Sequence, residues 1–231
     1  MSVLVATVVN EDKDYCLDIY ARQINSFSYP NYDTYIVDVS QDPLYIERLW
    51  RMGVEVERIP PIGRELDYVC SGYNAIRDKV LYENFEWLFL LDSDVFVPLN
   101  ILDYLKRQRN PVHAFTYFIN DNAAHCLQFD NNKGFRVDPS TGDYLFVHDT
   151  PVNECRLGMD FDVYGIGLGC VFIHRSVLEQ INFRTTKNDI PTAAYFFSDV
   201  KKSKIKPVID TSIIPAHYKS KSLITDLRVY Q

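Results

Sequence analysis

Apolar strands alternate with amphipathic helices over the first hundred residues. Residues 2–9 form an unbroken apolar, β-branched run, which is typical of a strand buried on both faces. Apolar residues recur every three or four positions from Leu66 to Val80, which predicts an amphipathic helix. The same pattern predicts strands at 34–39, 54–59 and 87–91 and helices at 15–27 and 43–52. This alternation predicts an α/β fold with a mostly parallel, doubly wound sheet.

The pattern changes after Pro98. Residues 121–160 hold short polar strands and turn signals such as Asp138-Pro139, which predict a small antiparallel insertion. The remaining elements are expected as helices at 101–107, 176–181 and 192–202, strands at 112–119 and 169–174, and an extended segment at 207–214. We therefore expect one domain at 1–217, with halves at 1–97 and 98–217, followed by a basic tail at 218–231.

Composition and charge narrow the classes of partner. The net charge of -7 argues against a nucleic-acid partner. The segment from Lys187 onward is basic on an acidic body, so it can contact a membrane surface peripherally, lie beside a phosphate or simply be solvated. No run approaches the roughly 20 apolar residues of a spanning helix. The five cysteines include no C-x-x-C, so we expect a cytoplasmic protein without a disulfide framework or a zinc site.

Asp92-Ser93-Asp94 is the strongest chemical signal. This D-x-D motif directly follows the apolar strand at 87–91, and ligands of open α/β sheets bind where such strands end. Two carboxylates in this spacing can share a divalent cation that neutralises a diphosphate leaving group, although a helix cap or surface turn is the alternative. The triplets that do not follow a buried strand directly are Asp12/Asp14 and Asp160/Asp162.

The segment from Trp87 to Pro98, WLFLLDSDVFVP, resembles the D-x-D segment of GT-A fold glycosyltransferases, particularly family 2 and its relatives. The resemblance covers roughly residues 1–217. It implies a metal-dependent hexosyltransferase that uses a nucleotide diphosphate sugar (a UDP- or GDP-sugar), with a sugar, lipid-linked or protein acceptor. Asp92, Ser93 and Asp94 would contact the donor, and Asp92 and Asp94 would bind Mn²⁺ or Mg²⁺.

Three further segments resemble donor-binding parts of the same family. The donor contacts that they imply are Thr7, Val9 and Asn10 after the first strand, Asp38 after the second, and Asn74 and Arg77 on the helix that contains Gly72. Asn74 and Arg77 are three residues apart and share a helix face. Taken without the family pattern, Asn74 suits a surface position equally well, and Arg77 suits a surface ion pair.

Gly165, Gly167 and Gly169 resemble the acceptor-side loop of the family. Such a cluster indicates unusual backbone angles or a close approach of a ligand, and a tight turn without a ligand is the alternative. The spacing G-x-G-x-G is not a Rossmann fingerprint, because it does not open a helix.

Asp199 resembles the general base of inverting members, with Ser198 where the family usually has Glu. A base deprotonates the acceptor hydroxyl as it attacks the anomeric carbon. An ion pair with Lys201 or Lys202 is the alternative role of Asp199, and Asp160 and Asp162 are rival bases. A retaining reaction on the same fold stays open.

His217 resembles the late histidine that binds the metal in many GT-A enzymes, and an imidazole beside carboxylates suits Mn²⁺. We expect structural roles for the other histidines, which are His113, His125, His148 and His174.

Two other functions share the scaffold. A nucleotidyltransferase usually carries a Gly-rich, basic N-terminal loop, which residues 7–10 lack. A non-catalytic nucleotide-sugar-binding module would bind a donor without hydrolysing it. The residues after His217 can close over the donor, contact a lipid-linked acceptor or form a homodimer.

Overall fold

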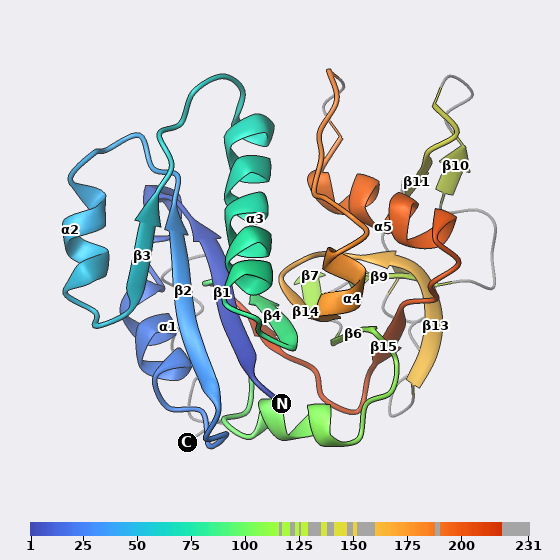
Figure 1. Cartoon of the computed structure of the whole chain (residues 1–231), viewed down its shortest axis with the longest axis horizontal. Coiled ribbons are helices and arrows are strands. Elements are labelled where there is room, and N and C mark those ends of the chain that lie inside the picture. The colour runs from blue at the N-terminus through green and yellow to red at the C-terminus, as the bar shows by residue number, and fades with distance from the viewer. Residues whose placement is uncertain are drawn as a thin grey trace.

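A mixed sheet runs through the centre of the molecule in the computed structural model (Figure 1). The structure describes residues 1–115, 117–120, 123–124, 126–128, 135–137, 141–146, 150–151, 160–187 and 190–218. Within these residues, nine strands are ordered β3 (Glu55–Arg58), β2 (Tyr32–Asp38), β1 (Val3–Val9), β4 (Trp87–Leu91), β14 (Cys170–His174), β6 (Val112–Phe115), β15 (Val208–Asp210), β13 (Asp160–Ile166) and β9 (Cys126–Gln128).

The first four strands of this order are parallel, as the sequence predicts. Val3 lies opposite Tyr32 on β2 and opposite Trp87 on β4. The carboxyl ends of β1, β2 and β4 therefore meet at one edge of the sheet. The acidic triplet directly follows β4 at this edge.

Helices cover both faces of the sheet, which confirms the doubly wound arrangement (Figure 1). One face packs against α3 (Glu65–Tyr82), α4 (Arg175–Leu178) and α5 (Thr192–Lys202), and the other against α1 (Leu17–Ile24), α2 (Tyr45–Trp50) and the 3₁₀ helix η2 (Ile101–Lys106). Alternate residues of β1 point into the hydrophobic cores on opposite faces of the sheet. Leu4 packs in the core on the α3 face, and Val5 packs in the core on the α1 face. Gly72 lets α3 approach β1 closely, since a Cβ there would lie 2.9 Å from the methyl groups of Val8.

Strand β14 changes the direction of the sheet, because it is antiparallel to both β4 and β6. Strand β15 is again parallel to β6, and β13 is antiparallel to β15. The predicted strand at 112–119 divides, since β6 ends at Phe115 and β7 (Phe118–Asn120) belongs to a separate sheet.

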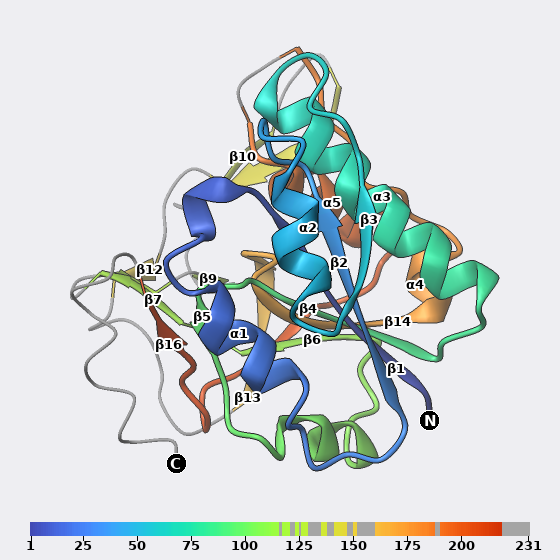
Figure 2. The same cartoon turned by 90° about the vertical axis from the view of Figure 1, so that its left-hand side faces the viewer.

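Small antiparallel sheets follow β6, which confirms the predicted insertion. They consist of β7 with β8 (Ala123–Ala124) and β12 (Thr150–Pro151), and of β10 (Phe135–Val137) with β11 (Tyr144–Phe146). A further antiparallel pair, β5 (Val95–Phe96) with β16 (Ala216–His217), lies close to α1 (Figure 2).

No helix in the described part of the chain is long and apolar enough to cross a membrane. Of the predicted basic tail at 218–231, Tyr218 is described and the rest lies outside the described residues.

Candidate functional site

Asp94 and His217 meet at the carboxyl edge of the parallel strands. β16 pairs with β5 in a register that sets His217 opposite Val95, and Tyr218 N–H donates to the Asp94 carbonyl at 2.9 Å. The imidazole Nε2 of His217 lies 3.5 Å from Oδ2 of Asp94. The fold therefore brings together two predicted metal ligands that lie 123 residues apart in the sequence.

Lys13 also contacts the carboxylate of Asp94, a contact that the sequence interpretation missed. Its ammonium forms an ion pair with Oδ2 of Asp94. Lys13 is the last residue of the 3₁₀ helix η1 (Glu11–Lys13), which directly follows β1. The available signal was a charged run, Glu11 to Asp14, just after a strand that neighbours β4 in a parallel sheet.

Tyr15 also contacts Asp94. Its hydroxyl lies 3.5 Å from Oδ2 of Asp94 and donates to the carbonyl of Tyr218 at 2.6 Å. Tyr15 thereby links the segment after β1 to the segment after β16. The sequence interpretation missed this residue too.

The electrostatics of the site keep Asp94 ionised. Burial opposes ionisation, but the hydrogen bond with His217 and the charge of Lys13 outweigh it, so the pKa of Asp94 is lowered. Burial likewise opposes the charge of Lys13, and the nearby carboxylate of Asp94 still raises the pKa of Lys13. The second oxygen of Asp94, Oδ1, is buried and has no hydrogen-bond partner. An ionised oxygen without a donor is costly, and a bound cation would relieve that cost.

A divalent cation fits this arrangement with two protein ligands. Asp94 offers an orphaned oxygen and His217 a nitrogen, a combination that suits Mn²⁺. Among the described residues, no group of three or more His, Cys, Asp or Glu side chains could hold a metal. A cation held by the described residues alone would need further ligands from water or from a bound substrate.

Asp92 lies beside the glycine loop. A Cβ at Gly169 would lie 2.6 Å from Oδ2 of Asp92 and 2.4 Å from the hydroxyl oxygen of Tyr117. Asp92 N–H donates to the Gly169 carbonyl at 2.9 Å. A residue without a side chain is thus needed at position 169, because the protein's own side chains approach it closely. Ser93, the middle residue of the triplet, is buried.

Unusual backbone angles do not explain the glycine loop. Among the described residues, the glycines with positive φ are Gly53, Gly63 and Gly142. Gly165 and Gly167 are buried, and the pairing of β13 with β9 shifts register between Val163 and Gly165.

The residues predicted to bind the nucleoside are mostly buried. Asp38 is fully buried; its Oδ2 accepts from Arg58 Nη1 at 3.0 Å and its Oδ1 from Ser40 N–H at 2.8 Å. Thr7 and Val9 are each 1% exposed, whereas Asn10, at the start of η1, is partly exposed. A nucleoside contact of Asp38 stays a prediction, and its pairing with Arg58 weighs against it.

Asn74 and Arg77 share a face of α3, as predicted, but both side chains form hydrogen bonds with backbone groups of the protein itself. Asn74 Nδ2 donates to the Phe183 carbonyl at 2.8 Å, and Asn74 Oδ1 accepts from Phe183 N–H at 3.1 Å. Arg77 Nε donates to the carbonyls of Leu178 at 2.8 Å and Ile181 at 3.2 Å. Both side chains tie α3 to the segment around α4, which weighs against the predicted donor contacts.

Asp199, on α5, lies in an ion-pair cluster. Arg184 donates to both of its oxygens, with Nε 2.6 Å from Oδ2 and Nη2 2.9 Å from Oδ1. Lys202 Nζ lies 3.9 Å away, and both Arg184 and Lys202 also bind the buried Asp143. The ion pair considered from the sequence exists, with Arg184 as the main partner.

The structure describes only some of the side chains among the rival bases and the other histidines. β13 contains Asp160 and Asp162, but their side chains lie outside the described residues, as do His125 and His148. His174 is structural, since its Nδ1 accepts from Ser176 N–H at the start of α4. His113 is fully buried in β6.

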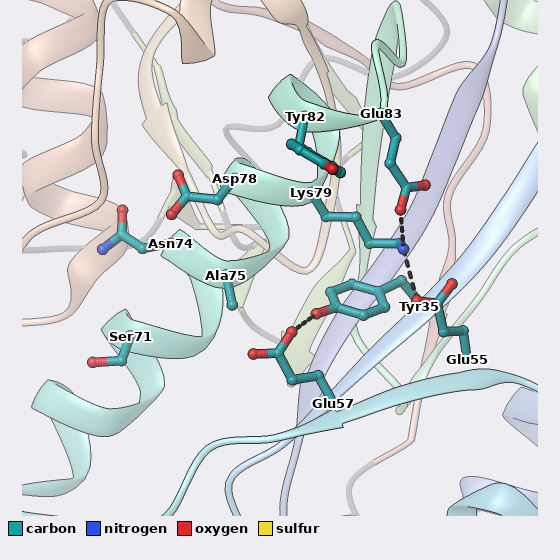
Figure 3. A pocket seen from close by; sticks show the side chains of 10 residues that line it. All are labelled: Tyr35, Glu55, Glu57, Ser71, Asn74, Ala75, Asp78, Lys79, Tyr82 and Glu83. Carbon is teal, nitrogen blue, oxygen red and sulfur yellow. Dashed lines mark hydrogen bonds and ion pairs between the residues drawn. The ribbon is translucent and has the colours of Figure 1, made fainter.

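A separate groove of about 640 Å³ lies between α3 and the edge of the sheet (Figure 3). Lys79 sits between Glu55 and Glu83, and Tyr35 donates to Glu57. Four carboxylates and one ammonium line the groove, so it would repel a diphosphate. The groove is therefore not the donor site that the sequence predicts.

No protein-family model and no curated protein matches the chain. Among solved structures, it is similar to the mannosyltransferase PcManGT from Pyrobaculum calidifontis in complex with GDP-Man and Mn²⁺, at 12% identity and a TM-score of 0.58. It is also similar to residues 1–349 of TarS from S. aureus in complex with UDP-GlcNAc, at 12% identity and a TM-score of 0.55. The two matches cover 99% and 95% of this chain.

The chain spans 58% of the PcManGT chain and 60% of the TarS chain. These likenesses show the fold, and the predicted glycosyltransferase fold of the GT-A type is confirmed. A197 from STIV, at 18% identity over 96% of this chain and 87% of its own, has a TM-score of 0.49.

Proposed function

We propose that this chain is a metal-dependent glycosyltransferase that moves a sugar from a nucleotide diphosphate sugar to an acceptor. The observation that carries the proposal is the pairing of Asp94 with His217 at the carboxyl edge of the parallel strands. Support comes from the two neighbours of the same fold, one in complex with GDP-Man and Mn²⁺ and one with UDP-GlcNAc.

In this proposal Asp94 and His217 hold Mn²⁺ or Mg²⁺, which when bound neutralises charge on the departing diphosphate. Burial of Asp94 at 1% exposure removes competing water from the carboxylate and strengthens its electrostatic interactions. Asp92 lies next to Gly169, in the loop that we propose for the acceptor side, and is proposed to contact the ribose of the donor or the cation. Asn10 is proposed to contact the donor beside the end of β1.

Asp199 remains our proposed base for an inverting reaction. Its side chain is 24% exposed, and each carboxylate oxygen keeps a lone pair besides the bond to Arg184. An acceptor hydroxyl within hydrogen-bond reach could therefore transfer its proton there. Retention stays open, as do Asp160 and Asp162 as bases.

The identity of the acceptor stays a prediction: a sugar, a lipid-linked acceptor or a protein. A cytoplasmic location, a peripheral membrane contact and a homodimer are likewise predictions. Release of UDP or GDP from a donor without an acceptor would separate an enzyme from a non-catalytic binding module. Release of the sugar from the donor, instead of transfer of the nucleotidyl group, would distinguish a glycosyltransferase from a nucleotidyltransferase.

The test is a thermal-shift panel of UDP, GDP and their sugars, with and without Mn²⁺, on the wild type and on Asp94→Asn. We expect a metal-dependent shift with a nucleoside diphosphate that Asp94→Asn loses. Asp103→Asn is the matched control, because Asp103 is exposed and pairs with Lys106. Equal shifts in Asp94→Asn and the wild type would refute the role of Asp94.

A further inference from the structure

Lys13 places a positive charge on the same carboxylate that we assign to the metal. We propose that Lys13 neutralises Asp94 in the empty protein and binds the donor diphosphate once a divalent cation occupies the site. This inference rests on the proposed function and adds to it a residue that couples metal binding to nucleotide binding.

The backbone of Lys13 is fixed, but its side chain is reachable. Lys13 N–H donates to the Asn10 carbonyl at 3.2 Å, and the Lys13 carbonyl accepts from Cys16 N–H at 3.2 Å and from Cys16 Sγ at 3.1 Å. The side chain of Lys13 is 39% exposed, whereas that of Asp94 is 2% exposed. A flexible ammonium on a fixed backbone can turn from Asp94 to a ligand that arrives from solvent.

The distribution of contacts around Asp94 is uneven. Lys13, His217 and the Tyr15 hydroxyl all contact Oδ2, whereas Oδ1 is buried and has no hydrogen-bond partner. A dication that binds Asp94 while Lys13 stays in place would bring like charges onto one carboxylate, which is unfavourable. An arriving diphosphate removes this conflict, because its oxygens can accept from the ammonium and bind the cation together.

Among the described residues, the other basic side chains that we consider near this edge already have partners. Arg58 donates to Asp38 and to the Ser40 carbonyl, and Arg48 pairs with Asp14. Of these three described side chains, Lys13 is the one whose present partner is itself a proposed metal ligand. Binding of the metal would displace Lys13 from Asp94, and displacement would free it for phosphate.

If Lys13 competes with the cation for Asp94 and also binds the diphosphate, replacing Lys13 should affect metal affinity and nucleotide affinity in opposite directions. In Lys13→Met, Mn²⁺ alone should bind at least about threefold more tightly, because a competing cation is gone. UDP or GDP, with Mn²⁺ saturating, should bind about tenfold or more weakly, because a charge-assisted hydrogen bond is lost. A residue that only supports the fold would not change the two affinities in opposite directions.

The experiment titrates Mn²⁺ alone, by electron paramagnetic resonance of the free ion, and then titrates UDP and GDP by calorimetry. Lys106→Met is the control, since Lys106 is 60% exposed and pairs with Asp103, and Lys13→Arg should restore most of the nucleotide affinity. Weaker or unchanged Mn²⁺ binding in a folded Lys13→Met overturns the inference. A wild type that binds Mn²⁺ but neither nucleotide refutes the proposed function itself, and the role of Lys13 with it.

Discussion

His217 Nε2 lies 3.5 Å from Asp94 Oδ2 because two short strands, β5 and β16, pair in a register that sets His217 opposite Val95. The imidazole also makes an edge-to-face contact with Tyr117, at 5.0 Å between ring centroids. Backbone pairing and aromatic packing thus position the proposed ligand pair.

Replacement of His217 by Gln should weaken Mn²⁺ binding about tenfold or more, because the imidazole nitrogen is lost as a ligand. Asp94 should also lose a group that keeps it ionised. Mn²⁺ titration with UDP or GDP present measures the effect. The control is His174→Gln, which disturbs the start of α4 and should leave Mn²⁺ binding unchanged. Equal affinities in His217→Gln and the wild type would exclude His217 as a ligand.

Gly169→Ala should displace Asp92, since the added Cβ would lie 2.6 Å from its carboxylate and 2.4 Å from the Tyr117 oxygen. We expect a loss of about 1–3 kcal/mol in the free energy of unfolding, together with weaker donor binding. Urea unfolding and nucleotide-sugar titration measure the two effects.

Gly72→Ala is the comparison for Gly169→Ala. Its Cβ would press on the methyl groups of Val8 at 2.9 Å, between α3 and β1. We expect it to destabilise the protein and to leave donor affinity close to that of the wild type. If both variants lowered donor affinity equally, the special role of Gly169 beside Asp92 would be lost.

The local patterns of the sequence predict the parallel half of the fold well. The helix predicted at 192–202 is α5 with the same bounds, and the strand predicted at 87–91 is β4. These elements have strong periodicity or an unbroken apolar run, and short-range signals decide them. The position of Asp94 at the carboxyl edge followed from β4 alone.

Long-range pairing explains what the sequence could not predict. Phe183 binds Asn74 across 109 residues, and Arg58 binds Asp38 across 20. In each case a residue of the expected type has a protein partner that no local pattern identifies. For Lys13, in contrast, the long-range contact adds a residue to the candidate site. Its ion pair with Asp94 depends on the adjacency of β1 and β4 in the sheet, which no local pattern shows.

His113 should make the stability of the protein depend on pH. The residue is fully buried, both ring nitrogens have no hydrogen-bond partner, and burial lowers its pKa to about 4, although the charge of Asp210 opposes the shift. In the unfolded chain the pKa is about 6.5. Between these values the unfolded chain binds more protons, so stability present above about pH 6.5 is lost as pH falls towards 4.

The expected loss is about 3 kcal/mol over that window, from the difference between a pKa of about 6.5 in the unfolded chain and about 4 in the folded protein. Urea unfolding between pH 7 and pH 4 measures it, and His113→Leu should remove most of the slope in this range. An identical slope in the wild type and His113→Leu would show that other groups cause the pH dependence.

Asp199→Asn tests the proposed base separately from its ion pair. Arg184 and Lys202 are 34% and 40% exposed, so solvent screens the pairing and the loss of stability should be at most about 1 kcal/mol. If Asp199 is the base, donor turnover should fall about a hundredfold or more while Mn²⁺ and nucleotide affinities stay unchanged. Release of UDP or GDP from the donor, with water as acceptor, measures turnover.

Asp143→Asn distinguishes a catalytic role of Asp199 from a structural role of the ion-pair cluster that contains both carboxylates. Asp143 is buried and accepts from Arg184 and Lys202, both at 2.6 Å, and from Ser198 at 3.2 Å. Its loss should destabilise the protein by about 1–3 kcal/mol, because it joins α5 to the segment before β11. Turnover per folded molecule should stay within about threefold of the wild type, since in this assignment Asp143 accepts no proton. If turnover fell equally in both variants, the cluster would act through structure, and the base would have to be sought at Asp160 or Asp162.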